Sequence, residues 1–203
     1  MFKKLSILVA AGVLSVSLVA CSNNQNKQSG TGSDNTKTEQ SKDKASKKGT
    51  VYEIQGATTE DNGIVQTIQE VSVFDNMKDA VKSYGQSDLV VSEENKDKVT
   101  VVVKFEIVNK NDFMINTYPS QATFVTNTGE QVDADMWASD SFDGEIHGGV
   151  TKDGHVLFNL AKTSIDELKS FKMIWSTNSE SGTSDNYDDD YYKDNELEVT
   201  LTK

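Results

Sequence analysis

The densest group of potential ligand atoms in the sequence is an acidic segment near the C-terminus. Residues 185–194 read DNYDDDYYKD, so carboxylates and tyrosines crowd into ten positions. Calcium takes about six to eight oxygen ligands, and neighbouring aspartates can supply several of them. The segment lacks the alternating acidic spacing and the fixed glycine of a dedicated calcium loop. We expect a solvated loop, and the alternative is a calcium site formed by Asp188, Asp189, Asp190 and Asp194.

The tyrosines of this segment offer a different chemistry. Tyr187, Tyr191 and Tyr192 stand beside the carboxylates. An exposed tyrosine provides a large contact area at low entropic cost, which suits a protein or glycan contact. The alternative role is to pack the loop onto the domain. The sequence leaves both roles open, and an unknown protein or cell-wall partner is the binding partner that we expect.

A second acidic group runs from Asp133 to His147. Asp133 and Asp135 share one face of a predicted strand, which would suit a metal ion, but the same alternation places Trp137 beside them. We therefore expect a polar outer face here and no resident cofactor. Trp137 and Trp175 are both predicted to lie in the core, since tryptophan contributes a large apolar area to packing.

Catalytic motifs are scarce. His147 and His155 are the two imidazoles, and the sequence contains neither a Gly-x-Ser-x-Gly elbow nor a paired-histidine zinc motif. Carboxylates are plentiful, but nothing singles out two of them as a sugar-hydrolysing pair. We expect a protein that is not an enzyme, and a cell-wall-active enzyme is the least favoured alternative.

The single cysteine, Cys21, follows a short apolar segment near the N-terminus. Lys3 and Lys4 precede this segment, and polar residues follow the cysteine at once. The layout is typical of an export signal, and the segment is shorter than the roughly 20 apolar residues of a spanning helix. Residues 18–21, Leu-Val-Ala-Cys, resemble the lipobox of bacterial lipoproteins. The resemblance implies removal of residues 1–20 and a diacylglyceryl group on the Cys21 sulfur.

A lipid on Cys21 would place the protein at the cell membrane, on its extracytoplasmic face. Each buried methylene contributes about 0.8 kcal/mol, so two acyl chains form a stable anchor. No thiol would remain for a disulfide, a metal site or a nucleophile. Residues 22–50 contain no aromatic residue and no Val, Ile, Leu or Met, so residues 21–50 are predicted to be a disordered tether that carries the lipid.

The charge is distributed unevenly along the chain. The chain carries −12 in total; the leader contributes +2 and the tether +3, which leaves −17 for residues 51–203. This acidic field repels nucleic acid, so we expect no nucleic-acid partner. All 20 basic residues are lysine, which removes the planar fork that arginine offers to phosphate.

From residue 51 onward, apolar residues alternate with polar ones between short turns, which predicts an antiparallel all-β domain. Val99 to Asn109 is the clearest strand, and Ile64 to Phe74 requires a bulge near Gln69 or Glu70 if its apolar residues share one face. Asn127 to Gly129 and Lys152 to Gly154 are predicted turns. The other predicted strands are Val51 to Gln55, Leu89 to Ser92, Gln121 to Thr126, Gln131 to Trp137, His155 to Leu160, Phe171 to Trp175 and Glu196 to Leu201.

Two short helical segments are also predicted. Phe74, Met77, Val81 and Tyr84 have helical spacing, with Asp75 as a potential cap and Gly85 as a stop. Ser164 and Glu167 have the spacing of a capping box, which predicts one helical turn from Ser164 to Lys169.

The leader, the polar tether and the strand pattern together resemble small Gram-positive lipoproteins of unknown function with a single immunoglobulin-like domain. The residues that carry the resemblance are Val101 to Asn109, Thr126 to Gly129 and Gly154 to Leu160. It implies an immunoglobulin-like antiparallel β-sandwich over residues 51–203 and says nothing of activity. We expect a monomeric binding or adaptor module that presents acidic loops, with a calcium-dependent structural or adhesion domain as the alternative.

Overall fold

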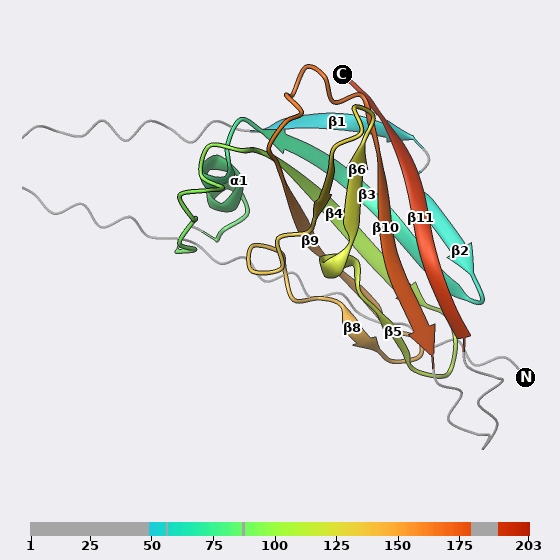
Figure 1. Cartoon of the computed structure of the whole chain (residues 1–203). Coiled ribbons are helices and arrows are strands. Elements are labelled where there is room, and N and C mark those ends of the chain that lie inside the picture. Colours follow the sequence, from blue (N-terminus) through green and yellow to red (C-terminus); the bar gives the residue numbers. More distant parts are fainter. Residues whose placement is uncertain (1–48, 56, 87, 180–190) are drawn as a thin grey trace, which may run out of the picture. The chain divides into compact units, whose positions relative to one another are not determined.

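The computed structural model describes residues 49–55, 57–86, 88–179 and 191–203, which form a mostly β domain (Figure 1). The predicted leader and all but the last two residues of the predicted tether lie outside these ranges. In chain order the elements are β1 (Thr50–Gln55), β2 (Thr58–Asp61), β3 (Ile64–Phe74), α1 (Met77–Ser83), β4 (Val99–Asn109), β5 (Ile115–Thr117), the 3-10 turn η1 (Pro119–Gln121), β6 (Thr123–Thr126), β7 (Gln131–Asp133), β8 (Gly144–Ile146), β9 (Thr151–Leu160), β10 (Ser170–Ser179) and β11 (Tyr191–Thr202).

The strands form an antiparallel sheet in the order β7-β6-β10-β11-β1-β3-β4-β9. Strand β1 joins the two halves, because Thr50–Tyr52 pair with β3 and Glu53–Gln55 pair with β11. Three short strands lie off this path: β2 pairs with β3, β5 pairs with β10, and β8 pairs with β5. The sheet curls until its end strands β7 and β9 approach each other, which gives the domain a nearly barrel-like form.

Alternation of side chains explains two long central strands, β3 and β4. Val101, Val103, Phe105 and Ile107 of β4 are all fully buried, as predicted. The pairing of β3 with β4 shifts register between Ile68 and Glu70, which confirms the predicted bulge. The bulge changes the parity of β3 so that apolar residues on both sides of it reach the same core.

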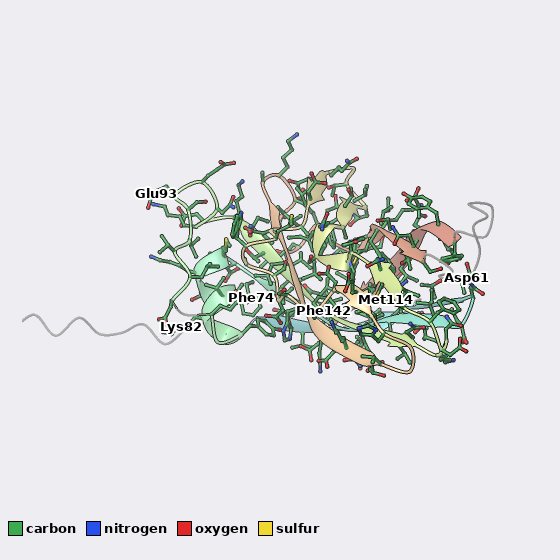
Figure 2. The ribbon with its side chains drawn as sticks, turned by 90° about the horizontal axis from the view of Figure 1, so that it is seen from below. Asp61, Phe74, Lys82, Glu93, Met114 and Phe142 are labelled. Carbon is green, nitrogen blue, oxygen red and sulfur yellow. The ribbon has the colours of Figure 1, made fainter. Side chains whose placement is uncertain are left out.

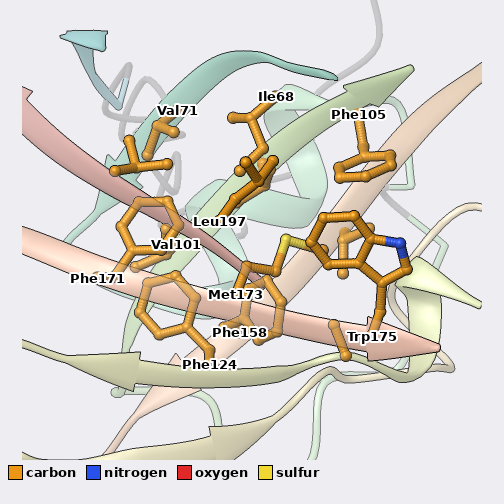
Figure 3. Packing of buried hydrophobic residues seen from close by; sticks show 14 of the residues in the cluster. Ile68, Val71, Val101, Phe105, Phe124, Phe158, Phe171, Met173, Trp175 and Leu197 are labelled. Carbon is orange, nitrogen blue, oxygen red and sulfur yellow. The ribbon is translucent and has the colours of Figure 1, made fainter. Parts of the chain in front are cut away.

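The main core lies between the two halves of the sheet (Figure 3). Phe124 stacks on Phe158 and Phe171, with ring centroids 4.6 and 4.3 Å apart. The Trp175 ring meets Phe105 edge-on at 5.1 Å, and Trp175 is 3% exposed. The predicted core position of Trp175 is therefore confirmed.

A second, smaller apolar cluster covers the outer face of the sheet around α1. Its buried members are Phe74, Met77, Ala80, Val81, Val102, Ala138 and Leu157. Helix α1 begins after Asn76, whose side chain accepts a hydrogen bond from the Asp79 N–H at 2.9 Å, so the predicted Asp75 cap is wrong by one residue. Gly85 follows the helix with a positive φ of 77°, as the predicted stop requires.

Several predicted strands and turns differ from the structure. Residues 89–92 form no strand, because Leu89 and Val91 pack against the small cluster from a loop. The strand predicted from Gln131 ends at Asp133, and the one predicted from Gln121 begins at Thr123 after η1. The predicted turn at 152–154 lies inside β9.

Local turn chemistry was predicted more reliably. Gly129 takes a positive φ of 86° in the β6–β7 hairpin. The Ser164 backbone N–H donates to the Glu167 carboxylate at 3.0 Å, which is one half of the predicted capping box, and the Ser164 hydroxyl donates to the same carboxylate at 2.6 Å. Residues 165–167 form a turn rather than the predicted helical turn. The short strands β2, β5 and β8 were not predicted, since three or four residues carry little periodicity.

Candidate binding surface

The most exposed aromatic side chain of the described residues belongs to the segment that follows β7. Trp137 is 90% exposed and Met136 is 57% exposed, so the predicted core position of Trp137 is wrong. Both residues lie in a tight turn within residues 134–140, which we call the strap. Exposure of a tryptophan at this level leaves roughly 4 to 5 kcal/mol of hydrophobic burial unused.

Backbone hydrogen bonds fasten the strap along the outer edge of β9. The Asp135 N–H donates to the Leu157 carbonyl at 2.8 Å, and the Asp140 N–H donates to the His155 carbonyl at 2.8 Å. In return, the Leu157 N–H donates to Ser139 Oγ at 3.0 Å. The strap therefore pairs with the edge of β9 near the point where the sheet approaches closure.

Two carboxylates complete this attachment. Asp135 Oδ2 accepts from Asn159 Nδ2 at 3.0 Å, and its Oδ1 accepts from the Ala138 N–H at 3.2 Å. Asp140 Oδ2 accepts from the backbone N–H and from the ring Nδ1 of His155, at 2.9 and 2.7 Å. These carboxylates therefore hold the turn in one conformation, and Trp137 is presented by a preorganised backbone.

The strap buries one part of its turn and exposes the other. Ala138 is fully buried in the small cluster and Ser139 is buried beside it, whereas Met136 and Trp137 face solvent. Residues 89–91 repeat this arrangement, since Leu89 and Val91 pack against the same cluster and Val90 is 91% exposed. We call Val90, Met136 and Trp137 together the Trp137 surface.

Acidic residues accompany this surface. The neighbouring loop, residues 88–98, carries four carboxylates and two lysines, Lys96 and Lys98, which pair with Glu93 and Glu94 at 2.6 and 3.1 Å. The loop is linked to the strap, because Asn95 Nδ2 lies 3.5 Å from Asp135 Oδ2. Figure 2 shows Glu93 and Lys82 at this end of the domain, away from Asp61.

The two histidines do not come together. His155 lies inside β9, three-quarters buried by side-chain area, with its ring against Tyr84 at a centroid distance of 4.4 Å. His147 is exposed in the loop after β8. Of the two serines next to Asp140 in sequence, Ser139 donates its hydroxyl to the Asp135 carbonyl at 2.8 Å, so this hydroxyl stabilises the strap.

The predicted metal ligands are only partly described. Asp188, Asp189 and Asp190 lie outside the described residues, as do Tyr187 and the lipid-accepting Cys21. Asp194 lies in β11, where it accepts a hydrogen bond from the Tyr192 hydroxyl at 2.9 Å. Among residues 49–55, 57–86, 88–179 and 191–203, no group of three or more His, Cys, Asp or Glu side chains is arranged to hold a metal ion.

The two described tyrosines of the acidic segment belong to strand β11, and they differ in environment. The Tyr191 hydroxyl donates to Asp61 Oδ2 at 3.1 Å, and Lys193 Nζ contacts the same oxygen at 2.7 Å. Burial, together with the neighbouring Asp61 carboxylate, raises the pKa of Tyr191 to about 12. Tyr192 is 66% exposed, so it is the one that can contact a partner.

Glu130 is a buried carboxylate that the sequence reasoning missed. Its oxygens accept from the backbone N–H groups of Ala161, Lys162 and Thr163 at 2.7, 3.0 and 2.6 Å. Burial raises the pKa of Glu130, but hydrogen bonds from the Thr163 side chain and from the three N–H groups outweigh it, so its pKa is lowered. Glu130 lines a polar pocket of about 280 Å³. The backbone N–H groups of Lys162 and Thr163 in this pocket already donate to Glu130.

No protein-family model and no curated protein matches the chain. Three solved structures are similar in fold at low scores. A conserved hypothetical protein from Bacillus anthracis is 16% identical with a TM-score of 0.43, over 63% of this chain and 92% of that one. A functionally unknown protein from Listeria monocytogenes is 13% identical with a TM-score of 0.41, over 76% and 87%. The yjhA protein from Bacillus subtilis is 12% identical with a TM-score of 0.43, over 68% and 94%.

These neighbours come from Bacillus and Listeria, and two of them are known only as hypothetical or functionally unknown proteins. They assign no function to this chain. Among the described residues, no helix is long and apolar enough to cross a membrane.

Proposed function

We propose that the protein is a membrane-anchored extracytoplasmic lipoprotein whose domain is a non-catalytic binding module. Lipid on Cys21 is the anchor, and the domain is a variant of the immunoglobulin-like sandwich in which strand β1 passes from one sheet to the other. The Trp137 surface is the binding face. The single observation that supports this role is a tryptophan 90% exposed on a strap that is hydrogen-bonded along its length.

The partner is a protein with an apolar pocket and a basic rim. Tryptophan is enriched among the side chains that dominate interface energies, especially where the free protein already holds it in position. The surrounding loop and the domain as a whole are acidic, so complementary charge on the partner would speed association. The same acidic charge repels an anionic lipid surface, so such a surface is not the partner of this face.

A paired substitution tests the binding role. The mature chain with Cys21→Ser is used to capture partners from detergent-solubilised envelopes of the producing cells. Trp137→Ala should weaken capture about 30-fold, as expected for a loss of about 2 kcal/mol at a hot spot. Val51→Ala, which trims another exposed apolar side chain, 52% exposed, serves as the matched control and should capture normally. Equal capture by both variants would contradict the proposal.

Anchoring is tested separately in the full-length chain. Cys21→Ser should move the protein from the membrane fraction to the soluble fraction, because its acyl chains would be lost. Cys21→Ser protein that stays in the membrane fraction after a high-salt wash would rule out lipid attachment as the anchor. The capture experiment does not depend on this result.

A further inference from the structure

Strands β8, β5, β10 and β11 lie side by side (Figure 1). Their register places a row of polar side chains across the outer face. The strand register places Glu145 opposite Asn116, Asn116 opposite Asn178, and Asn178 opposite Tyr192. We call these four residues the amide–tyrosine row. With strands about 4.8 Å apart, the row is roughly 14 Å long.

Alternation along each strand directs the row outward. Asn116 lies between the buried residues Ile115 and Thr117, and Asn178 lies between the buried residues Thr177 and Ser179. Both asparagines are partly exposed. Within the described part of the chain, neither amide group has a hydrogen-bond partner, so each offers two N–H donors and one carbonyl acceptor.

A buried hydrogen-bond network supports this row from the inside. Thr117 Oγ1 and Thr177 Oγ1 lie 2.8 Å apart, and Asn195 Nδ2 donates to Thr177 Oγ1 at 2.8 Å. Gln66 joins them, since its Nε2 donates to Thr177 Oγ1 at 3.1 Å and its Oε1 accepts from Trp175 Nε1 at 2.8 Å. Satisfied networks of this kind hold the backbone of neighbouring residues in place.

We infer that the amide–tyrosine row binds an uncharged oligosaccharide. The exposed ring of Tyr192 offers a flat face to the C–H face of a sugar ring, and hydrogen bonding to Asp194 restricts its hydroxyl. The two amides present paired donors and acceptors to sugar hydroxyls or N-acetyl groups. Their spacing, one strand apart, is close to the length of one sugar unit in an extended glycan.

Charge and composition argue against other occupants. Glu145 and Asp194 place negative charge at the row, which repels anionic polymers. The row contains no aliphatic anchor, so it lacks the apolar centre that a protein interface requires. The amide–tyrosine row is separate from the Trp137 surface. The saccharide proposal and the partner-binding proposal can therefore be tested independently.

Nuclear magnetic resonance titration of the mature chain with Cys21→Ser tests the inference. Fully N-acetylated chitotetraose is the uncharged probe, and trigalacturonate is the anionic comparison. We expect saturable shifts of the Asn116, Asn178 and Tyr192 amide signals with chitotetraose alone. Tyr192→Ala, and Asn116→Ala combined with Asn178→Ala, should each weaken binding about tenfold or more.

Trp137→Ala is the matched control and should bind the saccharide as the unsubstituted chain does. Tyr192→Phe keeps the ring, so it should retain most of the affinity, and it replaces Tyr192→Ala if that variant fails to fold. Absence of saturable shifts at millimolar chitotetraose would overturn the inference. Equal binding of trigalacturonate, or affinity unchanged by Tyr192→Ala or the paired asparagine substitutions, would overturn it as well.

Discussion

The two tryptophans of the chain occupy opposite environments. Trp175 lies on β10, 3% exposed, with its indole N–H bonded to Gln66 and its ring against Phe105. Trp137 lies on the strap, 90% exposed, although the strap itself is held by hydrogen bonds from both backbone and side chains. The chain thus buries one indole with a satisfied donor and holds the other outward on an ordered turn.

The two tryptophans therefore have different roles: Trp175 packs the core, and Trp137 is held out to solvent. Trp175 contributes to stability through area, contacts and one hydrogen bond. Trp137 contributes little to any of these, while hydrogen bonds of Asp135, Ala138 and Asp140 hold the backbone on both sides of it. Folding does not require a tryptophan at this exposed position. A contact with a partner molecule is therefore the better explanation for Trp137.

The largest effect that we expect is on stability at Trp175. Trp175→Ala should lower the free energy of unfolding by about 3 to 5 kcal/mol, because it leaves a cavity and removes the donor to Gln66. Trp137→Ala, the matched substitution, should change it by less than about 0.5 kcal/mol. Urea denaturation of both variants measures the difference. Comparable losses at the two positions would mean that Trp137 packs in solution.

The next effect is a pH dependence centred on Glu130 in the β6–β7 hairpin, which leads into the strap. Because the folded pKa of Glu130 is lowered from about 4.5, its contribution is fully present above that value and is lost as the pH falls through the lower, folded pKa. Glu130→Gln should lower the free energy of unfolding by about 2 kcal/mol at pH 7. It should also weaken the dependence of that free energy on pH below about 5. An unchanged slope of stability against pH would show that these N–H bonds form equally well with a neutral amide.

A smaller effect should follow from loosening the strap. Asp135→Ala removes the acceptor of Asn159 Nδ2 and of the Ala138 N–H, and we expect a loss of about 1 kcal/mol. Amide hydrogen exchange should accelerate at Ala138 and Leu157 while Phe105 and Trp175 stay protected. Asp133→Ala, an exposed carboxylate just before the strap, is the control. Uniform acceleration across the core would show that the strap is not an independent element.

Long alternating strands could be predicted from the sequence, and short or paired features could not. The bulge in β3 and the core position of Trp175 follow from parity, because a buried face constrains every second residue. Trp137 was misplaced because the alternation that begins at Gln131 continues in the sequence past the point where the backbone turns. The turn is set by hydrogen bonds from β9, some 20 residues away, which no local pattern reports.

The candidate sites show the same contrast between features that a local sequence pattern predicts and features that depend on distant residues. The predicted tyrosine contact stays a prediction at Tyr192, and its neighbours Asn116 and Asn178 come from strands distant in sequence. Glu130 was missed because its partners are backbone N–H groups, which carry no residue-type signal. The acidic segment at 185–190 lies outside the described residues, so its calcium alternative stays a prediction.

The most direct test of the binding role places a photoreactive benzoylphenylalanine at position 137 of the full-length chain in producing cells. Irradiation should yield one discrete protein adduct, and excess soluble chain with Cys21→Ser should compete it away, whereas the same chain with Trp137→Ala should not. The same residue at Thr200, an exposed position on β11, is the control and should give no such adduct. No adduct at 137, or the same adducts at both positions, would contradict the account.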